Sequence, residues 1–328
     1  MKIKTKDLRY EEVLALPREK HLNPMRQTGA VRLLLKAVSF FDLKAVGFTF
    51  EKTGMEKLAA EEPCLILMNH SSFIDLKIVA TLLSDREYHI VCTQDGFVGK
   101  RLLMRLLGCI PAKKFINDIT LIKDMRYTLQ KLHASVLMYP EASYSFDGTE
   151  TPLPDSLGKC IKLLKVPVVM IRTSGAFLRD PLYNGLQLRK TKVSAKMEYL
   201  LSPAEITSKS VGEINEILRN VFSFDYFKEQ QEQGILIKEP FRADGLQRAL
   251  YRCPHCQMEG MTEGKGTKLF CHACGISYEL SETGYLKADR GETCFSHIPD
   301  WYRWERECVR KELADGSYRL DIAVDIYM

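Results

Sequence analysis

The sequence predicts an α/β protein, a sheet with flanking helices, followed by a small cysteine-bearing β module. Short apolar runs alternate with segments of helical period between residues 64 and 173, the pattern of strands connected through helices. Two CxxC pairs then follow within residues 253–274. With 328 residues and 45% hydrophobic composition, the chain can fill one large domain and a smaller module.

The composition limits the ligands and the cellular compartment that we expect for the protein. The chain carries 47 Lys and Arg against 42 Asp and Glu, a net charge of +5 that suits phosphate-bearing ligands or an anionic membrane but demands neither. The first residues lack the apolar core of a secretory signal, and no segment reaches the roughly 18 apolar residues of a membrane span. We therefore expect a cytoplasmic protein whose ten cysteines are thiols or metal ligands rather than disulfides.

Residues 1–47 are expected to form an amphipathic helical segment. Arg32 and Lys36 lie one helical turn apart, on a different side from the apolar residues. The apolar residues that recur with helical period are Val31, Leu34, Leu35, Val38 and Phe41. Such a helix can pack on its own domain or lie on a membrane surface, and the periodicity leaves both alternatives open.

The main domain is expected over residues 48–245. Strands are predicted at 64–69, 87–93, 109–114, 135–140, 166–173 and 192–201, and helices at 73–83, 98–108, 121–133 and 156–165. Ser210 and Glu213 have the spacing of a capping box, which predicts a helix from there toward Phe227. The charged and Gln-rich residues 228–250 predict a linker.

A histidine and an aspartate follow the first of these strands, in the stretch NHSSFID at residues 69–75. With Ser71 or Ser72 as the N-cap of the next helix, His70 would lie in an exposed turn and Asp75 in the first helical turn. A carboxylate there can hold the imidazole in one tautomer, which is the arrangement of a general base. The same spacing also fits an ordinary loop histidine beside a helix-capping aspartate.

Three further segments follow in order, LGCIPAKKF at 107–115, YPEASYS at 139–145 and VPVVMI at 166–171. Together with NHSSFID they resemble the four sequence blocks of the glycerolipid acyltransferase superfamily, best known for enzymes that acylate lysophosphatidic acid. The order and the separation of the blocks both agree. The resemblance covers roughly residues 45–205 and implies an acyltransferase-type sheet.

This resemblance implies that His70 is the general base and that Asp75 orients it. An acceptor hydroxyl, expected to be that of 1-acylglycerol-3-phosphate, would attack an acyl-coenzyme A or acyl-carrier-protein thioester directly. No nucleophilic serine is then needed, so Ser71 and Ser72 are expected to be structural. The residues implied to contact substrate are Asn69, Lys113, Lys114, Glu141 and Ser145.

A basic patch accompanies the second block. Lys114 stands where the family has an arginine, and residues 95–131 contain eight Lys and Arg against three Asp. Such a patch can bind a phosphate, although a solvated basic face would give the same count. Because members of the family can attach to one leaflet without a span, the resemblance favours peripheral binding of residues 1–47 to the inner face of a membrane.

The third block departs from the family pattern Phe-Pro-Glu-Gly-Thr-Arg-Ser. Pro140, Glu141 and Ser145 are kept, whereas Ala142 replaces the glycine and Tyr144 replaces the arginine expected to touch the acceptor phosphate. An acyltransferase for another lipid or alcohol is therefore an alternative. A non-catalytic lipid-binding or acyl-carrier-binding protein, whose cysteine module docks a partner, is a second.

Residues 246–290 are expected to form a zinc ribbon. Two CxxC pairs, fourteen residues apart, can supply the four thiolates of a tetrahedral structural site, which would hold zinc or, as the alternative, iron. These are Cys253, Cys256, Cys271 and Cys274. No dense Lys/Arg stripe with interleaved aromatics occurs over 251–290, which argues against nucleic acid and favours a structural or docking role. Residues 291–328 predict a helix capped by Asp300 and then a strand.

Overall fold

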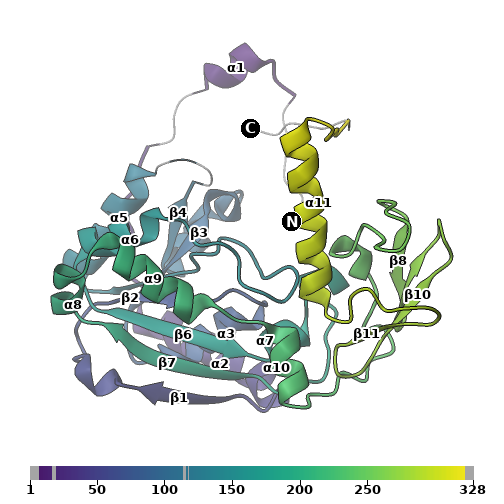
Figure 1. The fold of residues 1–328 in the computed structure, drawn as a ribbon. Coiled ribbons are helices and arrows are strands. Elements are labelled where there is room, and N and C mark those ends of the chain that lie inside the picture. The colour runs from purple at the N-terminus through teal and green to yellow at the C-terminus, as the bar shows by residue number, and fades with distance from the viewer. Residues whose placement is uncertain (1–6, 17–19, 114–115, 117, 322–328) are drawn as a thin grey trace.

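The computed structural model describes residues 7–16, 20–113, 116 and 118–321. Its larger sheet has seven strands in the order β1-β7-β6-β2-β5-β3-β4 (Figure 1). These strands are β1 Thr49–Thr53, β2 Leu65–Met68, β3 Tyr88–Thr93, β4 Cys109–Ala112, β5 Ser135–Met138, β6 Val168–Ser174 and β7 Ser194–Leu201. The α/β class predicted from the alternation is confirmed.

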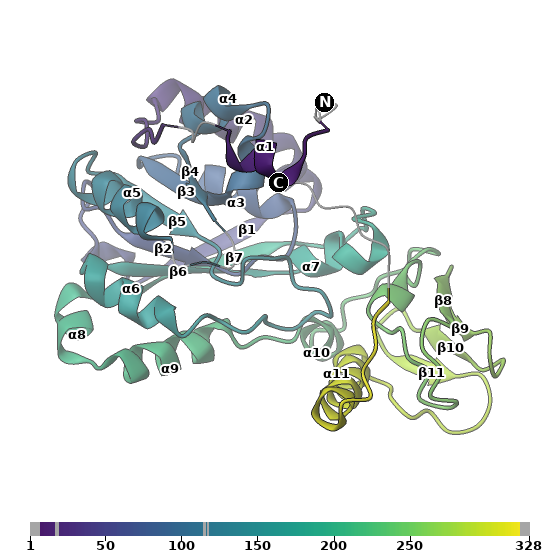
Figure 2. The same ribbon diagram turned by 90° about the horizontal axis from the view of Figure 1, so that it is seen from above.

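Helices cover both faces of this sheet. Figure 2 places α2, α3 and α4 on one side and α6, α8 and α9 on the other. The helices of this part are α1 Tyr10–Leu14, α2 Gly29–Ala45, α3 Ile74–Leu82, α4 Arg101–Leu106, α5 Ile119–Gln130, α6 Ser156–Leu164, α7 Ala176–Arg179, α8 Pro203–Ser208, α9 Val211–Phe222 and α10 Tyr226–Glu232. Four short 3-10 turns are η1 Met55–Lys57, η2 Gln94–Phe97, η3 Leu182–Asn184 and η4 Leu246–Arg248.

The central strand β2 is buried on both faces, which explains its uninterrupted apolar sequence. Ile66 and Met68 belong to the core beneath α2 and α3, whereas Leu65 and Leu67 belong to the core beneath α5, α6 and α9. Side chains alternate between the faces of a strand, so a strand between two helical layers has to be apolar at every position.

The direction of the strands determines where the loops that carry the first three sequence blocks lie. β2 pairs in parallel with β5 and β6, β5 with β3, and β3 with β4, whereas β7 is antiparallel to β6. The carboxyl ends of β2, β3, β4, β5 and β6 therefore lie along one edge of the sheet. The first three sequence blocks begin or end at these strand ends.

A second, antiparallel sheet lies at one end of the molecule, beside α10 and α11 (Figures 1 and 2). Its strands are β8 Thr262–Lys265, β9 Lys268–Cys271, β10 Ser277–Leu280 and β11 Leu286–Ala288, and α11 spans Ile298–Asp315. Within the described residues, no helix is both long enough and apolar enough to cross a membrane.

Local predictions have mixed outcomes. The capping box is confirmed, because Ser210 Oγ accepts the N–H of Glu213 and the Glu213 carboxylate accepts the N–H of Ser210. The predicted cap of the C-terminal helix is wrong, because Asp300 lies inside the first turn and His297 precedes the helix. Residues 318–321 form no strand, and the rest of that predicted strand lies outside the described residues.

The linker predicted over residues 228–250 is wrong. Part of the segment continues α10, and its apolar side chains Ile237, Ala243, Leu246 and Leu250 are buried in a core shared with the small sheet. The charged residues that suggested a linker are its solvent-facing positions, for example Glu232 and Lys238. Composition alone does not distinguish a segment that packs on the domain through a few apolar side chains from a free linker.

Candidate active site

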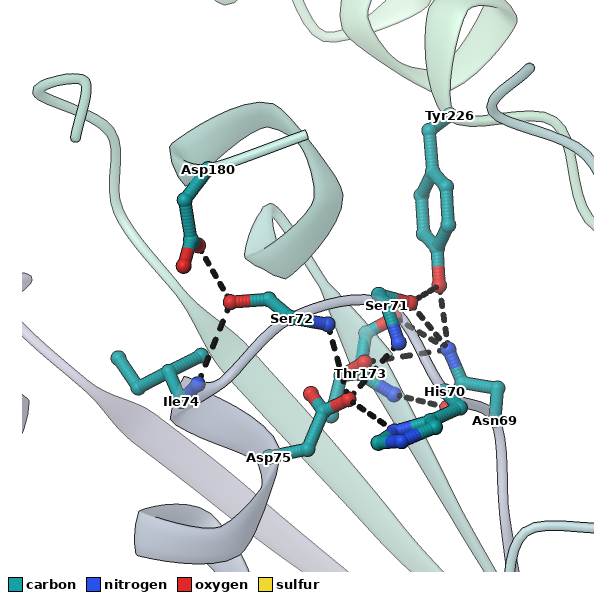
Figure 3. Close-up of polar contacts among 9 residues, drawn as sticks. All are labelled: Asn69, His70, Ser71, Ser72, Ile74, Asp75, Thr173, Asp180 and Tyr226. Carbon is teal, nitrogen blue, oxygen red and sulfur yellow. Dashed lines mark hydrogen bonds and ion pairs between the residues drawn. The ribbon is translucent and has the colours of Figure 1, made fainter. Parts of the chain in front are cut away.

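His70 lies two residues after β2, and Asp75 lies in the first turn of α3, as predicted. Nδ1 of His70 lies 3.0 Å from Oδ2 of Asp75. The same carboxylate oxygen accepts the backbone N–H groups of Ser71 at 2.8 Å and Ser72 at 3.0 Å (Figure 3). Asp75 is fully buried. The two backbone N–H groups of the turn therefore fix the carboxylate in the position from which it orients the imidazole.

This contact selects one tautomer of the histidine. An ionised carboxylate can only accept hydrogen bonds, so Nδ1 of His70 carries the proton and Nε2 carries the lone pair. Within the described part of the chain, Nε2 has no hydrogen-bond partner. The ring is thus arranged to accept a proton at Nε2.

The prediction that His70 lies in an exposed turn is wrong. Its side chain is only 19% exposed, because two tyrosines of the third block pack against the imidazole. The ring centroid of Tyr139 lies 4.0 Å from that of His70 with an interplanar angle of 25°, and the centroid of Tyr144 lies 4.1 Å away. Tyr144 also contacts Phe73. The position expected to hold an arginine therefore forms an aromatic wall of the site.

The serines after His70 are held in structural contacts. The Ser72 hydroxyl donates to the buried carboxylate of Asp180 and accepts the N–H of Ile74 at 3.2 Å. Neither serine is the N-cap of α3, which is Phe73. The capping prediction is wrong because Phe73 precedes the helix, although the Ser72 hydroxyl accepts the N–H of Ile74; Asp75 accepts the N–H groups of Ser71 and Ser72.

Asn69 is buried and its amide is used within the protein. Its Oδ1 accepts the N–H of Thr173 at 2.9 Å, and its Nδ2 donates to the Thr173 hydroxyl at 3.1 Å. Nδ2 also donates to the hydroxyl of Tyr226, which lies 2.6 Å from Oγ of Ser71. The residue predicted to contact substrate therefore faces protein groups.

The third block brings Glu141 and Ser145 close to His70. The backbone N–H of Ser145 donates to the carbonyl of His70 at 2.8 Å, and the Ser145 hydroxyl donates to the carbonyl of Thr149 at 2.7 Å. Glu141 is buried, and among the described residues neither of its carboxylate oxygens has a hydrogen-bond partner. Burial, together with the negative charge of Asp75, raises the pKa of Glu141 to about 9. Its carboxyl group is neutral at pH 7.

Lys113 follows β4 on the same edge of the sheet, three strands from His70, or about 14 Å at the usual strand spacing. Its side chain is exposed and lines a hollow of about 780 Å³. The other basic residues of that hollow are Lys20, His21, Arg101 and Arg105. Lys114, the second lysine predicted to bind substrate, lies outside the described residues.

The four predicted metal ligands converge. The Sγ atoms of Cys253, Cys256, Cys271 and Cys274 all lie within 4.8 Å of one another. Cys253 and Cys274 are 3.8 Å apart, and Cys256 and Cys271 are 3.7 Å apart. Tetrahedral zinc with Zn–S bonds of about 2.3 Å requires sulfurs about 3.8 Å apart, so the cluster fits this ion.

Sequence reasoning missed Tyr226, whose hydroxyl touches both neighbours of His70 in the chain. It lies 157 positions from Asn69, in a helix with no motif of its own. The ring contacts of Tyr139 were missed as well. A tyrosine in the third block signals a buried aromatic, but the pattern does not tell which ring it touches.

Comparison with known proteins links this site to a family. Residues 49–174 match the family model described as Acyltransferase. Over 128 residues the chain is 24% identical to 1-acyl-sn-glycerol-3-phosphate acyltransferase beta of Homo sapiens, covering 38% of this chain and 46% of that protein. Over 137 residues it is 30% identical to 1-acyl-sn-glycerol-3-phosphate acyltransferase BAT2, chloroplastic, of Brassica napus, covering 39% of each.

A solved structure is similar to part of the chain. The crystal structure of the 1-acyl-sn-glycerophosphate (LPA) acyltransferase PlsC from Thermotoga maritima aligns with a TM-score of 0.46 and 15% identity, covering 58% of this chain and 76% of that one. The chain spans less than half the length of the two curated relatives. Tyr226 and the cysteine cluster lie outside the matched residues. Residues 49–174, which carry His70 and Asp75, are therefore similar to the acyltransferase family and to the two named 1-acyl-sn-glycerol-3-phosphate acyltransferases.

Proposed function

We propose that this protein is an O-acyltransferase that moves a fatty acyl group from an acyl-thioester donor to a lysophospholipid hydroxyl, with 1-acylglycerol-3-phosphate as the acceptor. The observation that carries the proposal is the 3.0 Å contact between Nδ1 of His70 and Oδ2 of Asp75. It lies within the residues matched by the acyltransferase family. The names of the two curated relatives support the class of acceptor.

In the proposed reaction, Nε2 of His70 takes the proton of the acceptor hydroxyl as its oxygen attacks the thioester carbonyl carbon. A C–O bond forms and the C–S bond breaks. The imidazolium then gives its proton to the departing thiolate of coenzyme A or of the acyl carrier protein. Asp75 holds the ring and stabilises its positive charge, and a positioned general base contributes about 10²–10⁴-fold to the rate.

Glu141 and Lys113 are assigned to the acceptor. The neutral carboxyl of Glu141 can donate a hydrogen bond to a glycerol oxygen, which an ionised carboxylate cannot do. Lys113 provides a cation at the basic hollow, where the acceptor phosphate would bind together with Lys114. Asn69 and Ser145 are assigned to shaping the substrate site, because their side chains bond to protein groups on either side of it.

The lipid acceptor suggests attachment to a membrane surface. The outward face of α2 exposes Leu34, Val38 and Phe41, which are 63%, 63% and 75% exposed. The opposite face packs on α3 through residues such as Leu43. An amphipathic helix with an unpartnered apolar face suits the headgroup region of a bilayer. We assign α2 to peripheral binding on the inner face of the membrane.

The cysteine cluster is assigned to a structural Zn²⁺ ion. Four thiolates at tetrahedral spacing leave no open coordination position for substrate, which distinguishes a structural site from a catalytic one. The ion would hold the loops before β8 and after β9 together. No step of the acyl transfer requires it.

A second acceptor class is favoured by one observation. Tyr144 presents an aromatic ring, rather than a cation, beside His70 and Phe73. An acceptor alcohol without a phosphate would fit such a wall, with the same chemistry at His70. The non-catalytic alternative is less well supported, because the His70–Asp75 pair has the geometry of a working base.

The test is an acyl-transfer assay with purified protein, a panel of lysolipids and non-phosphorylated alcohols, and both labelled acyl-coenzyme A and labelled acyl carrier protein. Wild-type protein should transfer label to lysophosphatidic acid. His70→Ala should lower turnover at least about 10²-fold without changing the unfolding temperature by more than a few degrees. Asp75→Asn should cost less, because an amide still orients the ring. Turnover of His70→Ala within a few-fold of wild type would remove the proposed mechanism.

A further inference from the structure

We infer that Tyr226 is a positioning residue for His70 and that the cysteine module holds Tyr226 in place. The cysteine module here means residues 246–297, which contain the four clustered cysteines and the smaller sheet and end just before α11. The inference rests on the proposed acyl transfer and adds to it a role for the module beyond the acyltransferase domain. Tyr226 lies at the start of α10, outside the residues matched by the family. Its buried hydroxyl points toward Asn69 and Ser71, the two neighbours of His70 in the chain (Figure 3).

The hydroxyl of Tyr226 joins the two residues that flank His70. It accepts a hydrogen bond from Nδ2 of Asn69 and lies 2.6 Å from Oγ of Ser71. Asn69 is tied to Thr173 on β6 as well. The turn bearing His70 is therefore held from one side by Asp75 and from the other by Tyr226. Removing the second support leaves the turn and the general base free to shift.

The ring of Tyr226 is fixed by aromatic packing. It stacks on Phe177 with a centroid separation of 5.3 Å and an interplanar angle of 9°. Phe224 contacts it at 4.6 Å. The backbone N–H of Tyr226 donates to the carbonyl of Gly148, in the loop that follows the third block. A rigid ring in a single position presents its hydroxyl at a defined point, as a positioning residue requires.

The cysteine module packs against the other side of α10. Phe227 lies between Gly148, where a Cβ would come within 2.9 Å of its ring, and Gly284 in the turn between β10 and β11, where a Cβ would come within 3.0 Å. Gln230 donates to the carbonyl of Glu282 at 2.9 Å. His297, just before α11, lies 2.7 Å from Oδ2 of Asp225, the N-cap of α10.

One core joins these parts. Phe177, Tyr226 and Phe227 belong to the same buried cluster as the ligand residues Cys253 and Cys271. Close-packed interiors transmit displacement, because side chains have little free volume to absorb it. A change in the module therefore reaches the His70 turn through α10, without any contact between the module and substrate.

The first arm of the test compares two buried tyrosines in the full chain. Tyr226→Phe keeps the ring and removes only the hydroxyl, so kcat should fall about 10- to 100-fold while both KM values stay within about twofold. Tyr183→Phe is the matched control, because it loses hydrogen bonds to Arg189 and Arg242 away from the His70 turn. Its kcat should stay within about twofold of wild type at a similar loss of unfolding temperature.

A second readout of the same variants does not depend on turnover. The rate at which diethyl pyrocarbonate modifies His70, followed by mass spectrometry of its peptide at one fixed pH, should rise at least about threefold in Tyr226→Phe and stay unchanged in Tyr183→Phe. If wild-type protein transfers no acyl group at all, the proposed function fails, yet this rate still tests the positioning. An unchanged rate, or a kcat of Tyr226→Phe within twofold of wild type, overturns the inference.

The second arm addresses the module without touching its cysteines. Gly284→Ala would push a methyl group against Gln230 and Phe227 and should lower kcat at least about fivefold. Gly260→Ala is its control, since this glycine also has a positive φ, of 67°, but nothing lies within 4 Å of the added carbon. Equal kcat values for the two variants would overturn the role of the module in positioning.

Discussion

At the scale of one residue, the buried carboxyl of Glu141 makes the free energy of unfolding depend on pH. Its pKa is about 9 in the folded protein, well above the ordinary value of 4.5. The folded state therefore keeps a proton that the unfolded chain releases in this range. The stability that comes from Glu141 is complete below pH 4.5 and is lost as the pH rises toward 9.

We predict that Glu141→Gln makes unfolding less sensitive to alkaline pH. Thermal unfolding measured at about pH 6 and about pH 8.5 should show a smaller fall in midpoint for the variant than for wild type. Other buried acids are present in both proteins, so the difference between the two falls isolates Glu141. Equal falls would mean that this carboxyl is already ionised in the folded state.

The effect of substituting Lys113 on the KM of the acceptor distinguishes the two acceptor classes. If the acceptor carries a phosphate, Lys113→Met should raise its KM roughly 10- to 100-fold, the loss expected for a charge-assisted hydrogen bond, and leave the donor's KM nearly unchanged. Lys159→Met, an exposed lysine on α6, is the control. A rise in the donor's KM alone would assign the basic hollow to the donor. A silent Lys113→Met, with Tyr144→Arg harmful, would favour an acceptor without phosphate.

Residue identities predicted the contact between His70 and Asp75 but not its surroundings. The order of a strand and then a helix placed His70 in the turn and Asp75 in the first helical turn, and the family resemblance favoured their contact over an ordinary loop histidine. The tyrosines around His70 depend on how the third block folds. Ala142, which replaces the family's glycine, has a φ of 58°, in the left-handed region where glycine is preferred. The sequence thus revealed a substitution, and the structure shows that Ala142 adopts a backbone conformation that favours glycine.

At the scale of elements, the strongest periodic signals were the most predictive. The apolar runs of β2, β5 and β6 and the capping box of α9 follow from local sequence. The periodicity of α2 predicted an amphipathic helix, but not that Leu34, Val38 and Phe41 would point away from the domain. That choice is made by the shape of α3 and of the core beneath it.

We predict that the outward face of α2 binds lipid. The double variant Leu34→Ser and Phe41→Ser should weaken co-sedimentation with anionic vesicles at least about tenfold, because each exposed side chain would bury apolar area in the bilayer. Leu163→Ser, at an exposed leucine of α6, should bind as wild type does. An equal loss for Leu163→Ser would point to general surface hydrophobicity instead.

At the scale of the whole molecule, contacts between residues far apart in the chain could not be predicted from the sequence. The spacing of the CxxC pairs predicted the four converging thiols. It could not predict that the module's core includes Phe177, which follows β6, and Tyr226, whose hydroxyl contacts Asn69 and Ser71. Such contacts join residues that are far apart in the chain, as Phe177 and Tyr226 are at 49 positions, and their choice depends on the complementarity of two folded surfaces.

The shared core leads to the last prediction, that losing the proposed zinc ion impairs the proposed site at His70 as well as the module. Purified protein should contain one zinc per chain, with iron as the alternative that metal analysis would detect. Cys271→Ser should lose the ion, since structural zinc contributes on the order of 10 kcal/mol to the folding of small modules. The larger sheet should keep its secondary structure, but turnover should fall at least about tenfold because α10 loses its support. Cys294→Ser, at an exposed cysteine outside the cluster, should match wild type in metal content and turnover. Full turnover by metal-free Cys271→Ser would mean that the acyltransferase domain holds its catalytic turn without the module.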